Sequence, residues 1–214
     1  MLDLQKKLSD YVLSHTSPED EILYNLTRTT HIHAMQPRML SGHLQGKLLE
    51  FFSHMISPQN ILEIGTYTGY SAICLAKGLQ NNGTLHTIDI NAELRHIAEE
   101  YINKTDYKNN IKLHTGNALE IISQLNCTFD LVYIDGDKRE YVAYYEEVID
   151  RTNLGGIIIA DNVLWSGKIL EDAKPNDKYT AELIKFNNLI QNDNRVENIL
   201  LPLRDGMMIM RKIR

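Results

Sequence analysis

Apolar residues in the first quarter of the chain recur at three- and four-residue spacing, from Leu2 to about Ile56. This period places them on one side of a helix, so the pattern predicts an all-helical segment. Ser17–Asp20, with a proline followed by two acids, is typical of a helix start within it. The apolar positions that carry the pattern are Leu4, Leu8, Tyr11 and Val12, followed by Ile22, Leu23 and Leu26.

From Asn60 onward, short β-rich runs alternate with longer amphipathic segments. The predicted strands are 60–65, 84–90, 111–116, 130–135 and 155–161. The predicted helices between and after them are 69–80, 92–104, 117–125, 139–152 and 178–192. Such alternation indicates βαβ units, hence an α/β fold whose mainly parallel sheet has helices on both faces.

The rhythm changes near the end of the chain. Two apolar runs, Val196–Leu203 and Met207–Ile213, follow each other closely and are joined by Arg204-Asp205-Gly206. Asp-Gly between such runs is a hairpin signal, so we expect an antiparallel pair to close the sheet. The 214 residues then form one domain, with an N-terminal helical cap over 1–56 and a core over 57–214.

Composition narrows the class of protein. Hydrophobic residues make up 43% of the chain, the net charge is −6, and the 22 basic residues are scattered, which disfavours a bulk polyanion partner without excluding one. Cys74 and Cys127 lack metal-ligand spacing, and no apolar run approaches the roughly 20 residues of a membrane-spanning helix. The N-terminal stretch also lacks the apolar segment of a signal peptide, so we expect a cytoplasmic protein.

Oxygen-bearing side chains follow two of the predicted strands. Asp135 lies in Tyr133–Lys138, and Asp161 and Asn162 lie in Ile159–Val163, in each case after an apolar run. The carboxyl ends of neighbouring parallel strands converge in the crevice where open α/β sheets bind ligands. Two carboxylates and an amide make a hard oxygen site, which predicts bound Mg²⁺ or another divalent cation.

A glycine turn, Leu62–Ser71, links the first predicted strand to a helix, where doubly wound folds hold a nucleotide-like ligand. Only Gly65 and Gly69 are present, so the G-x-G-x-x-G fingerprint is absent and NAD is the weaker interpretation. Glu63 adds a negative charge, which repels phosphate but suits a ligand with an ammonium and a sulfonium. This points to S-adenosylmethionine.

Polar groups also follow the second and third strands. Asp89 is placed to accept hydrogen bonds from ribose hydroxyls, and Asn117 and Ala118 lie where an adenine edge would be. Singly, each such residue has an ordinary structural alternative, since a glycine turn or a helix cap needs no ligand. Polar residues at the ends of successive strands favour a binding site over a set of caps.

Seven stretches together resemble the divalent-cation-dependent O-methyltransferases, the family of catechol and caffeoyl-CoA O-methyltransferases. They are Met39–Gly46, Leu62–Ser71, Thr87–Asp89, Phe129–Lys138, Tyr144–Glu146, Gly155–Trp165 and Leu201–Gly206. The resemblance covers nearly the whole chain and implies a class I, Rossmann-like, seven-stranded mixed sheet with the last strand antiparallel. It also implies a small-molecule substrate and a homodimer supported by the N-terminal helices.

The resemblance assigns roles residue by residue. It implies that Asp135, Asp161 and Asn162 bind the metal and that Lys138 is the catalytic lysine, in contact with the substrate. With the glycine turn and Asn117, it predicts a cofactor site formed by Met39, Ser41, Glu63, Gly65, Tyr67, Ser71, Asp89, Asn117, Ala118 and Asp135. Tyr67 is expected to pack beside the sulfonium.

Some assignments keep alternatives. Lys138 is either a catalytic group or a solvated surface lysine, and as a catalytic group it is either a base or an electrostatic stabiliser. Trp165 either walls the substrate ring or anchors a loop. Where mammalian catechol enzymes carry a glutamate that holds the second hydroxyl, this chain has Asn198–Pro202, and Gly136 replaces the usual small residue after the first metal aspartate.

Three functions follow from these observations. The leading hypothesis is a Mg²⁺-dependent, cytoplasmic enzyme of the EC 2.1.1 class that methylates one hydroxyl of a catechol-like compound. The second is a tRNA 5-hydroxyuridine methyltransferase of the same family, which a basic stripe around the pocket would favour. The third is a metal-free regulatory protein that keeps the fold, which the intact metal pair and Lys138 oppose.

Overall fold

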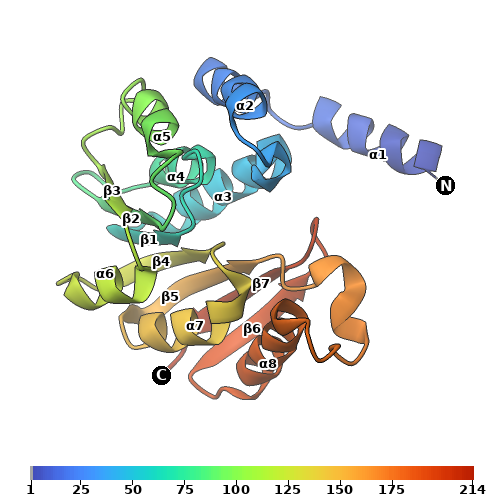
Figure 1. Cartoon of the computed structure of the whole chain (residues 1–214). Helices are drawn as coiled ribbons and strands as arrows, with labels where there is room; N and C mark the ends of the chain where they lie inside the picture. Colours follow the sequence, from blue (N-terminus) through green and yellow to red (C-terminus); the bar gives the residue numbers. More distant parts are fainter. Residues whose placement is uncertain (1) are drawn as a thin grey trace.

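A seven-stranded mixed sheet forms the centre of the protein, in the order β3-β2-β1-β4-β5-β7-β6 (Figure 1). The computed structural model describes residues 2–214. The strands are β1 Asn60–Ile64, β2 Thr84–Asp89, β3 Ile111–Thr115, β4 Phe129–Ile134, β5 Thr152–Asp161, β6 Val196–Leu201 and β7 Met207–Lys212. β1 to β5 pair in parallel, and β7 is antiparallel to both neighbours, which confirms the predicted topology.

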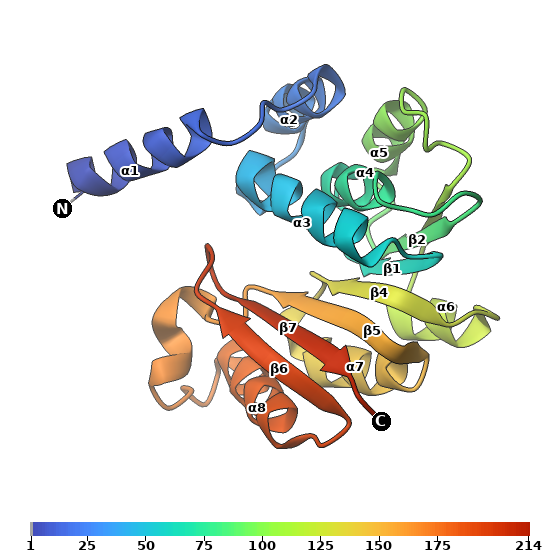
Figure 2. The ribbon, with the colours of Figure 1, turned by 180° about the vertical axis from the view of Figure 1, so that it is seen from behind.

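Helices cover both faces of this sheet (Figures 1 and 2). One face carries α3 (Gly42–Ile56), α4 (Tyr70–Ala76) and α5 (Arg95–Ile102), and the other carries α6 (Ala118–Gln124), α7 (Tyr141–Ile149) and α8 (Lys178–Asn192). Strand residues alternate between the two cores: Ile61 packs on the α3 side and Leu62 on the α6 side. Each such fully buried side chain contributes roughly 1.5–3 kcal/mol, which makes the strand register strongly specified.

The N-terminal helices have two different environments. α2 (Glu21–His33) begins after Asp20, whose side chain accepts a hydrogen bond from the Leu23 backbone N–H, as the helix-start signal predicted. α3 packs closely on α4, since a Cβ at Gly46 would lie 2.5 Å from the Tyr70 ring. α1 (Leu2–Ser14) instead projects from the body in both ribbon views (Figures 1 and 2).

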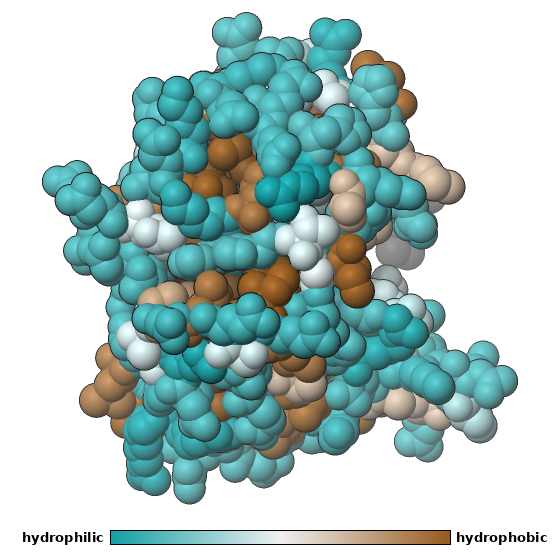
Figure 3. Space-filling view, turned by 60° about the vertical axis from the view of Figure 1, so that its left-hand side comes forward, coloured by the Kyte–Doolittle hydropathy of each residue, from teal (hydrophilic) through white to brown (hydrophobic). Residues whose placement is uncertain are grey.

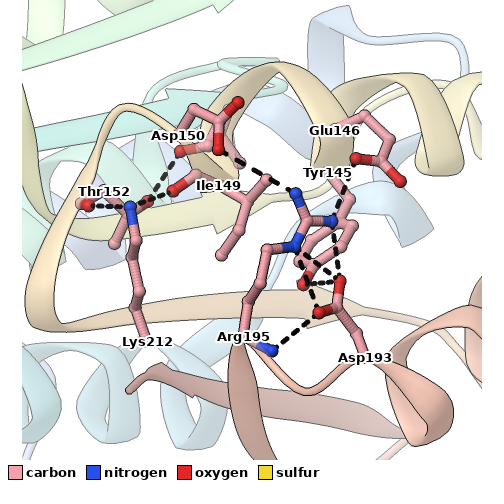
Figure 4. A network of polar contacts seen from close by, with 9 residues as sticks. Tyr145, Glu146, Ile149, Asp150, Thr152, Asp193, Arg195 and Lys212 are labelled. Atoms are coloured by element: carbon pink, nitrogen blue, oxygen red, sulfur yellow. Dashed lines mark hydrogen bonds and ion pairs between the residues drawn. The ribbon is translucent and has the colours of Figure 1, made fainter. Parts of the chain in front are cut away.

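A network of polar contacts connects several segments at the amino-terminal end of the parallel strands (Figure 4). Arg195 pairs with Asp193 at 2.7 Å, and Lys212 donates hydrogen bonds of 2.8 and 2.9 Å to the carbonyls of Ile149 and Thr152. These contacts connect the ends of α7 and β7 to the starts of β5 and β6. Ligands of open α/β sheets bind at the opposite, carboxyl end, so we interpret this network as structural.

The molecular surface is mostly hydrophilic on the face seen in Figure 3, where apolar residues form separate patches. Across residues 2–214, no helix combines the length and the apolar character that crossing a membrane requires.

Three short 3₁₀ segments complete the fold: η1 Pro37–Met39, η2 Lys138–Glu140 and η3 Trp165–Leu170. Each contains one residue of the predicted site: Met39, Lys138 and Trp165, respectively.

Candidate active site

The carboxyl ends of four neighbouring strands bring the predicted ligand residues to one edge of the sheet. β1 leads into Gly65, β2 ends at Asp89, β4 leads into Asp135 and β5 ends at Asp161. These strands are adjacent in the sheet order, so residues far apart in the chain become neighbours. The site therefore lies where a parallel sheet is expected to bind its ligand.

Asp161 is buried and held by three hydrogen bonds. Its Oδ1 accepts from the Asn162 backbone N–H at 2.8 Å, and its Oδ2 accepts from Gln45 Nε2 at 2.5 Å and Tyr133 Oη at 3.1 Å. Asn162 has a φ of 59°, a left-handed conformation that asparagine tolerates better than most residues. Within the described chain, its side-chain amide makes no hydrogen bond, which leaves that amide available to a ligand.

Lys138 is connected to both predicted metal aspartates. Only 7% exposed, it donates from Nζ to Asp135 Oδ1 at 2.8 Å and to Tyr141 Oη at 2.5 Å. Tyr141 Oη in turn donates to the Asp161 carbonyl oxygen at 2.9 Å. The interpretation of Lys138 as a solvated surface lysine is therefore wrong, because burying an ammonium requires such partners.

The carboxylates of Asp135 and Asp161 interact with each other in a part of the protein that is largely shielded from solvent. Burial raises the pKa of Asp135 to about 6, and the Asp161 charge acts in the same direction, against the opposing charge of Lys138. Like charges in such a place favour a bound cation. Among residues 2–214, no group of three or more His, Cys, Asp and Glu side chains suits a metal ion, so a metal here depends on the Asn162 amide as third ligand. That all-oxygen donor set fits Mg²⁺.

Glu63 is a buried carboxyl with one unused oxygen. Its Oε2 accepts from Thr87 Oγ1 at 2.5 Å, whereas Oε1 has no hydrogen-bond partner among the described residues. Burial raises the pKa of Glu63 to about 8, and the charges of Asp135 and Asp89 add to the rise. An unpaired buried carboxyl oxygen costs free energy unless a donor arrives, so Glu63 fits a cationic ligand such as the ammonium of S-adenosylmethionine.

Replacing Glu63 by glutamine is expected to change how stability depends on pH. The folded-state pKa near 8 lies above the ordinary 4.5, so the stabilisation from protonated Glu63 is complete below pH 4.5 and is lost as pH rises from 4.5 to 8. Glutamine does not titrate, so the variant should gain on the wild type by roughly 1.4 kcal/mol per pH unit in this window. Urea unfolding at several pH values measures this, with exposed Glu120→Gln as control; equal pH slopes for Glu63→Gln and wild type would contradict it.

The glycine turn and Asp89 form a small pocket. Gly65 has a φ of 108°, and a Cβ there would lie 2.3 Å from the Asp135 carbonyl oxygen, so no other residue fits. Asp89 accepts hydrogen bonds from the backbone N–H groups of Tyr67 at 2.7 Å and Asn91 at 2.8 Å. Asp89 thus orders the loop, and each oxygen keeps a second lone pair for a ligand. The pocket is lined by Thr66, Tyr67, Asp89, Asn91, Arg95, Leu113, His114 and Thr115.

The remaining predicted cofactor residues come from several other segments. Ser71 is buried in the first turn of α4, and Ala118 is buried at the start of α6. Asn117 caps α6 by accepting from the Glu120 N–H at 3.2 Å, so its structural role is realised. Met39 is exposed in η1 and Ser41 precedes α3; Tyr67 Oη connects this segment to the site through a 2.9 Å hydrogen bond to the Gln36 carbonyl.

Trp165 anchors the loop that follows Asp161 and Asn162, two of the predicted metal ligands. Its ring stacks on Tyr179 at 6.0 Å between centroids with an interplanar angle of 17°, and it packs against the core on the α6 side. Its Nε1 is buried without a hydrogen-bond partner in the described chain. The loop-anchor interpretation thus has direct support, whereas a contact with substrate stays a prediction.

Four residues next to the predicted site escaped the sequence analysis. Gln45, Tyr133, Tyr141 and Arg204 contact the predicted metal or lysine residues directly or through one partner. Nothing in the sequence distinguishes these four from ordinary core or surface residues.

Comparison with known proteins identifies the family of the chain. A sequence model of the O-methyltransferase family matches residues 13–213. The caffeoyl-CoA O-methyltransferase of Petroselinum crispum is 32% identical over 206 residues, which cover 91% of this chain and 85% of that protein. Caffeoyl-CoA O-methyltransferase 2 of Eucalyptus globulus is 33% identical over 180 residues, 79% of this chain and 73% of that protein.

Solved structures of O-methyltransferases share the fold of this chain. An O-methyltransferase from Bacillus cereus in complex with SAH aligns with a TM-score of 0.91 at 28% identity, covering 99% of this chain and 100% of the other. The O-methyltransferase TomG from Streptomyces achromogenes, in complex with SAM, aligns with a TM-score of 0.89 at 25% identity, covering 97% and 96%. The chain belongs to the O-methyltransferase family and is an S-adenosylmethionine-dependent O-methyltransferase.

Proposed function

We propose that this enzyme transfers the methyl group of S-adenosylmethionine to one hydroxyl of a catechol-like small molecule, with Mg²⁺ or another divalent cation bound by Asp135, Asp161 and Asn162. The observation that carries the proposal is the meeting of two carboxylates, a free amide and a buried lysine at one edge of the sheet. The names of the caffeoyl-CoA O-methyltransferase relatives support an aromatic acceptor with neighbouring oxygens.

The reaction is an in-line displacement. The acceptor oxygen forms a bond to the methyl carbon, the sulfur–carbon bond breaks, and its electron pair stays on sulfur, which gives S-adenosylhomocysteine. Most of the barrier reduction must come from aligning the two reactants. A divalent cation would supply a template that chelates both hydroxyls and lowers the pKa of the one that reacts.

The chain's own residues supply the rest of the mechanism. Lys138 lies next to Asp135, where its ammonium stabilises a developing phenolate or, after losing its proton, accepts the hydroxyl proton. Glu63 receives the ammonium of the cofactor and Asp89 its ribose hydroxyls. Gly65 lets the backbone approach closely, and Tyr67, Met39, Ser41, Ser71, Asn117 and Ala118 surround the cofactor.

One assay tests the proposal. Purified protein is given labelled S-adenosylmethionine and Mg²⁺ with catechols, caffeoyl thioesters, and unmodified or hydroxylated tRNA, each with and without chelator. We expect labelled product from a catechol-like acceptor, and its loss in chelator. Labelling of hydroxylated tRNA alone would contradict the substrate class, and full activity in chelator would contradict the metal.

We also propose that the enzyme is a homodimer held together in part by α1. Helix α1 projects from the body (Figure 2). Leu4, Leu8 and Tyr11 share one side of it by helical spacing and are 72%, 60% and 61% exposed. An apolar stripe this exposed favours a partner surface, and a second copy of the chain supplies one symmetrically.

Placing a charge in the α1 stripe is expected to weaken this dimer. Leu8→Glu should shift the mass measured by light scattering toward the monomer at micromolar concentration, because the carboxylate would have to be buried at the interface. Asp10→Glu in the same helix, which adds no charge, is the control. A wild-type protein that is monomeric at all concentrations would contradict the dimer itself.

The remaining features fit a single methyltransferase domain. We infer that residues 57–214 form the catalytic core and that the helical segment 1–56 covers one side of it. We further propose a cytoplasmic location, which the two free cysteines, Cys74 and Cys127, support because thiols persist in a reducing compartment.

A further inference from the structure

The turn between β6 and β7 contacts both sides of the active site, although the sequence suggested only a hairpin. Arg204, in this turn, has a φ of 49°, a left-handed conformation uncommon for a residue other than glycine. The contacts of the Arg204 side chain show which parts of the protein this turn connects.

The Arg204 guanidinium reaches the start of α3. Its Nη1 donates to Gln45 Oε1 at 2.7 Å and also to the carbonyl oxygen of Ser41, while the Leu40 carbonyl lies within 3.5 Å. Ser41 belongs to the predicted cofactor site. Arg204 therefore connects the β6–β7 turn to the segment that leads into α3.

Gln45 transmits this contact to Asp161. Gln45 is only 1% exposed, and its side-chain amide has a single oxygen. Because arginine can only donate hydrogen bonds, Arg204 must face that oxygen and so fixes the orientation of the amide. The amide nitrogen must then point to the other side, where it donates to Asp161 Oδ2 at 2.5 Å and to Tyr133 Oη at 2.8 Å. The arrangement determines the orientation of the Asp161 carboxylate.

The same turn also holds the backbone beyond Asn162. The Asp205 carbonyl accepts from the Leu164 N–H at 2.8 Å, and the Gly206 carbonyl accepts from the Val163 N–H at 3.1 Å. A Cβ at Gly206 would lie 2.3 Å from Leu164 Cγ, so the two segments are in close contact. The loop with two proposed metal ligands thus depends on this turn for its position.

We propose that Arg204 is a positioning residue for the metal site: through Gln45 it orients Asp161 so that the carboxylate is ready to bind a cation. The inference rests on the proposed function, because it assigns Arg204 a role only in the proposed metal site. Residues that orient a metal ligand typically change metal affinity by about 10–100-fold when they are removed.

The test uses Arg204→Gly, because glycine relaxes the left-handed backbone while it removes the side-chain contacts together with the guanidinium charge that acts on Asp135. Mn²⁺ binding is followed by electron paramagnetic resonance, SAH binding by calorimetry, and stability by thermal unfolding. We expect Mn²⁺ affinity to fall about tenfold while thermal unfolding shows that the variant stays folded at the temperature of the binding measurement. Arg204→Lys, which keeps a donor toward Gln45, should restore part of the affinity.

A double-mutant comparison separates this path from a general effect on the turn. Gln45→Met removes the relay with little change in volume, so adding Arg204→Gly to it should weaken Mn²⁺ binding less than about twofold further. Full multiplication of the two effects, or unchanged Mn²⁺ affinity in Arg204→Gly, would overturn the inference while leaving the proposed function intact. A wild-type protein that binds SAH but no Mn²⁺ would overturn both.

Discussion

Replacing Asp161 by alanine is expected to lower the methyl-transfer rate roughly a thousandfold, the range seen when a principal electrostatic contact of a transition state is removed. Asp161 is the more deeply buried of the two carboxylates, and its loss would leave the proposed cation site with Asp135 and one amide. The two hydroxyls of the acceptor would then lose their template. Affinity for SAH should change only a few-fold, because the cofactor site that we propose depends on Glu63 and Asp89.

The measurement pairs single-turnover rates with SAH calorimetry. Asp172→Ala, which removes an exposed carboxylate from the following loop, is the matched control. Asp161→Ala also leaves the Gln45 and Tyr133 donors without their acceptor, at a cost of about 1–3 kcal/mol in stability, so unfolding must be measured alongside. A folded Asp161→Ala protein with wild-type turnover in chelator would show that no metal takes part.

Replacing Lys138 by methionine is expected to reduce the single-turnover rate by roughly two to three orders of magnitude with little change in SAH affinity. Methionine keeps much of the aliphatic stem, so the change removes mainly the ammonium, which lies 4.7 Å from the centroid of the Tyr141 ring. Without that charge, the acceptor oxygen would lose the stabilising partner that we propose for it, and Asp135 loses an ion pair of 2.8 Å.

Two further variants make this prediction specific. Arg139→Ala removes the neighbouring cation, which is exposed and pairs with Asp137, and should leave the rate near wild type. Lys138→Arg distinguishes the two roles: partial activity indicates electrostatic stabilisation, and inactivity indicates a base, because arginine does not release its proton. An unchanged single-turnover rate in Lys138→Met would exclude both.

Local patterns predicted the elements well where one period dominated. The alternation of buried residues in β1 follows from the two-residue repeat of a strand, and the Asp-Gly hairpin and the Asp20 helix start follow from turn and cap chemistry. Boundaries were less accurate: α5 spans Arg95–Ile102 instead of 92–104, and β5 begins at Thr152 instead of 155, because ends depend on hydrogen bonds to other elements.

The sequence by itself determined which residues end the parallel strands, and with that the edge of the sheet where Asp89, Asp135 and Asp161 meet. Only the tertiary structure decided what each of them contacts. Gln45 reaches Asp161 across 116 positions of the chain and Arg204 across 159, distances over which no periodicity carries information. Strand order follows from local repeats, whereas the partner of a buried polar atom depends on how remote elements pack.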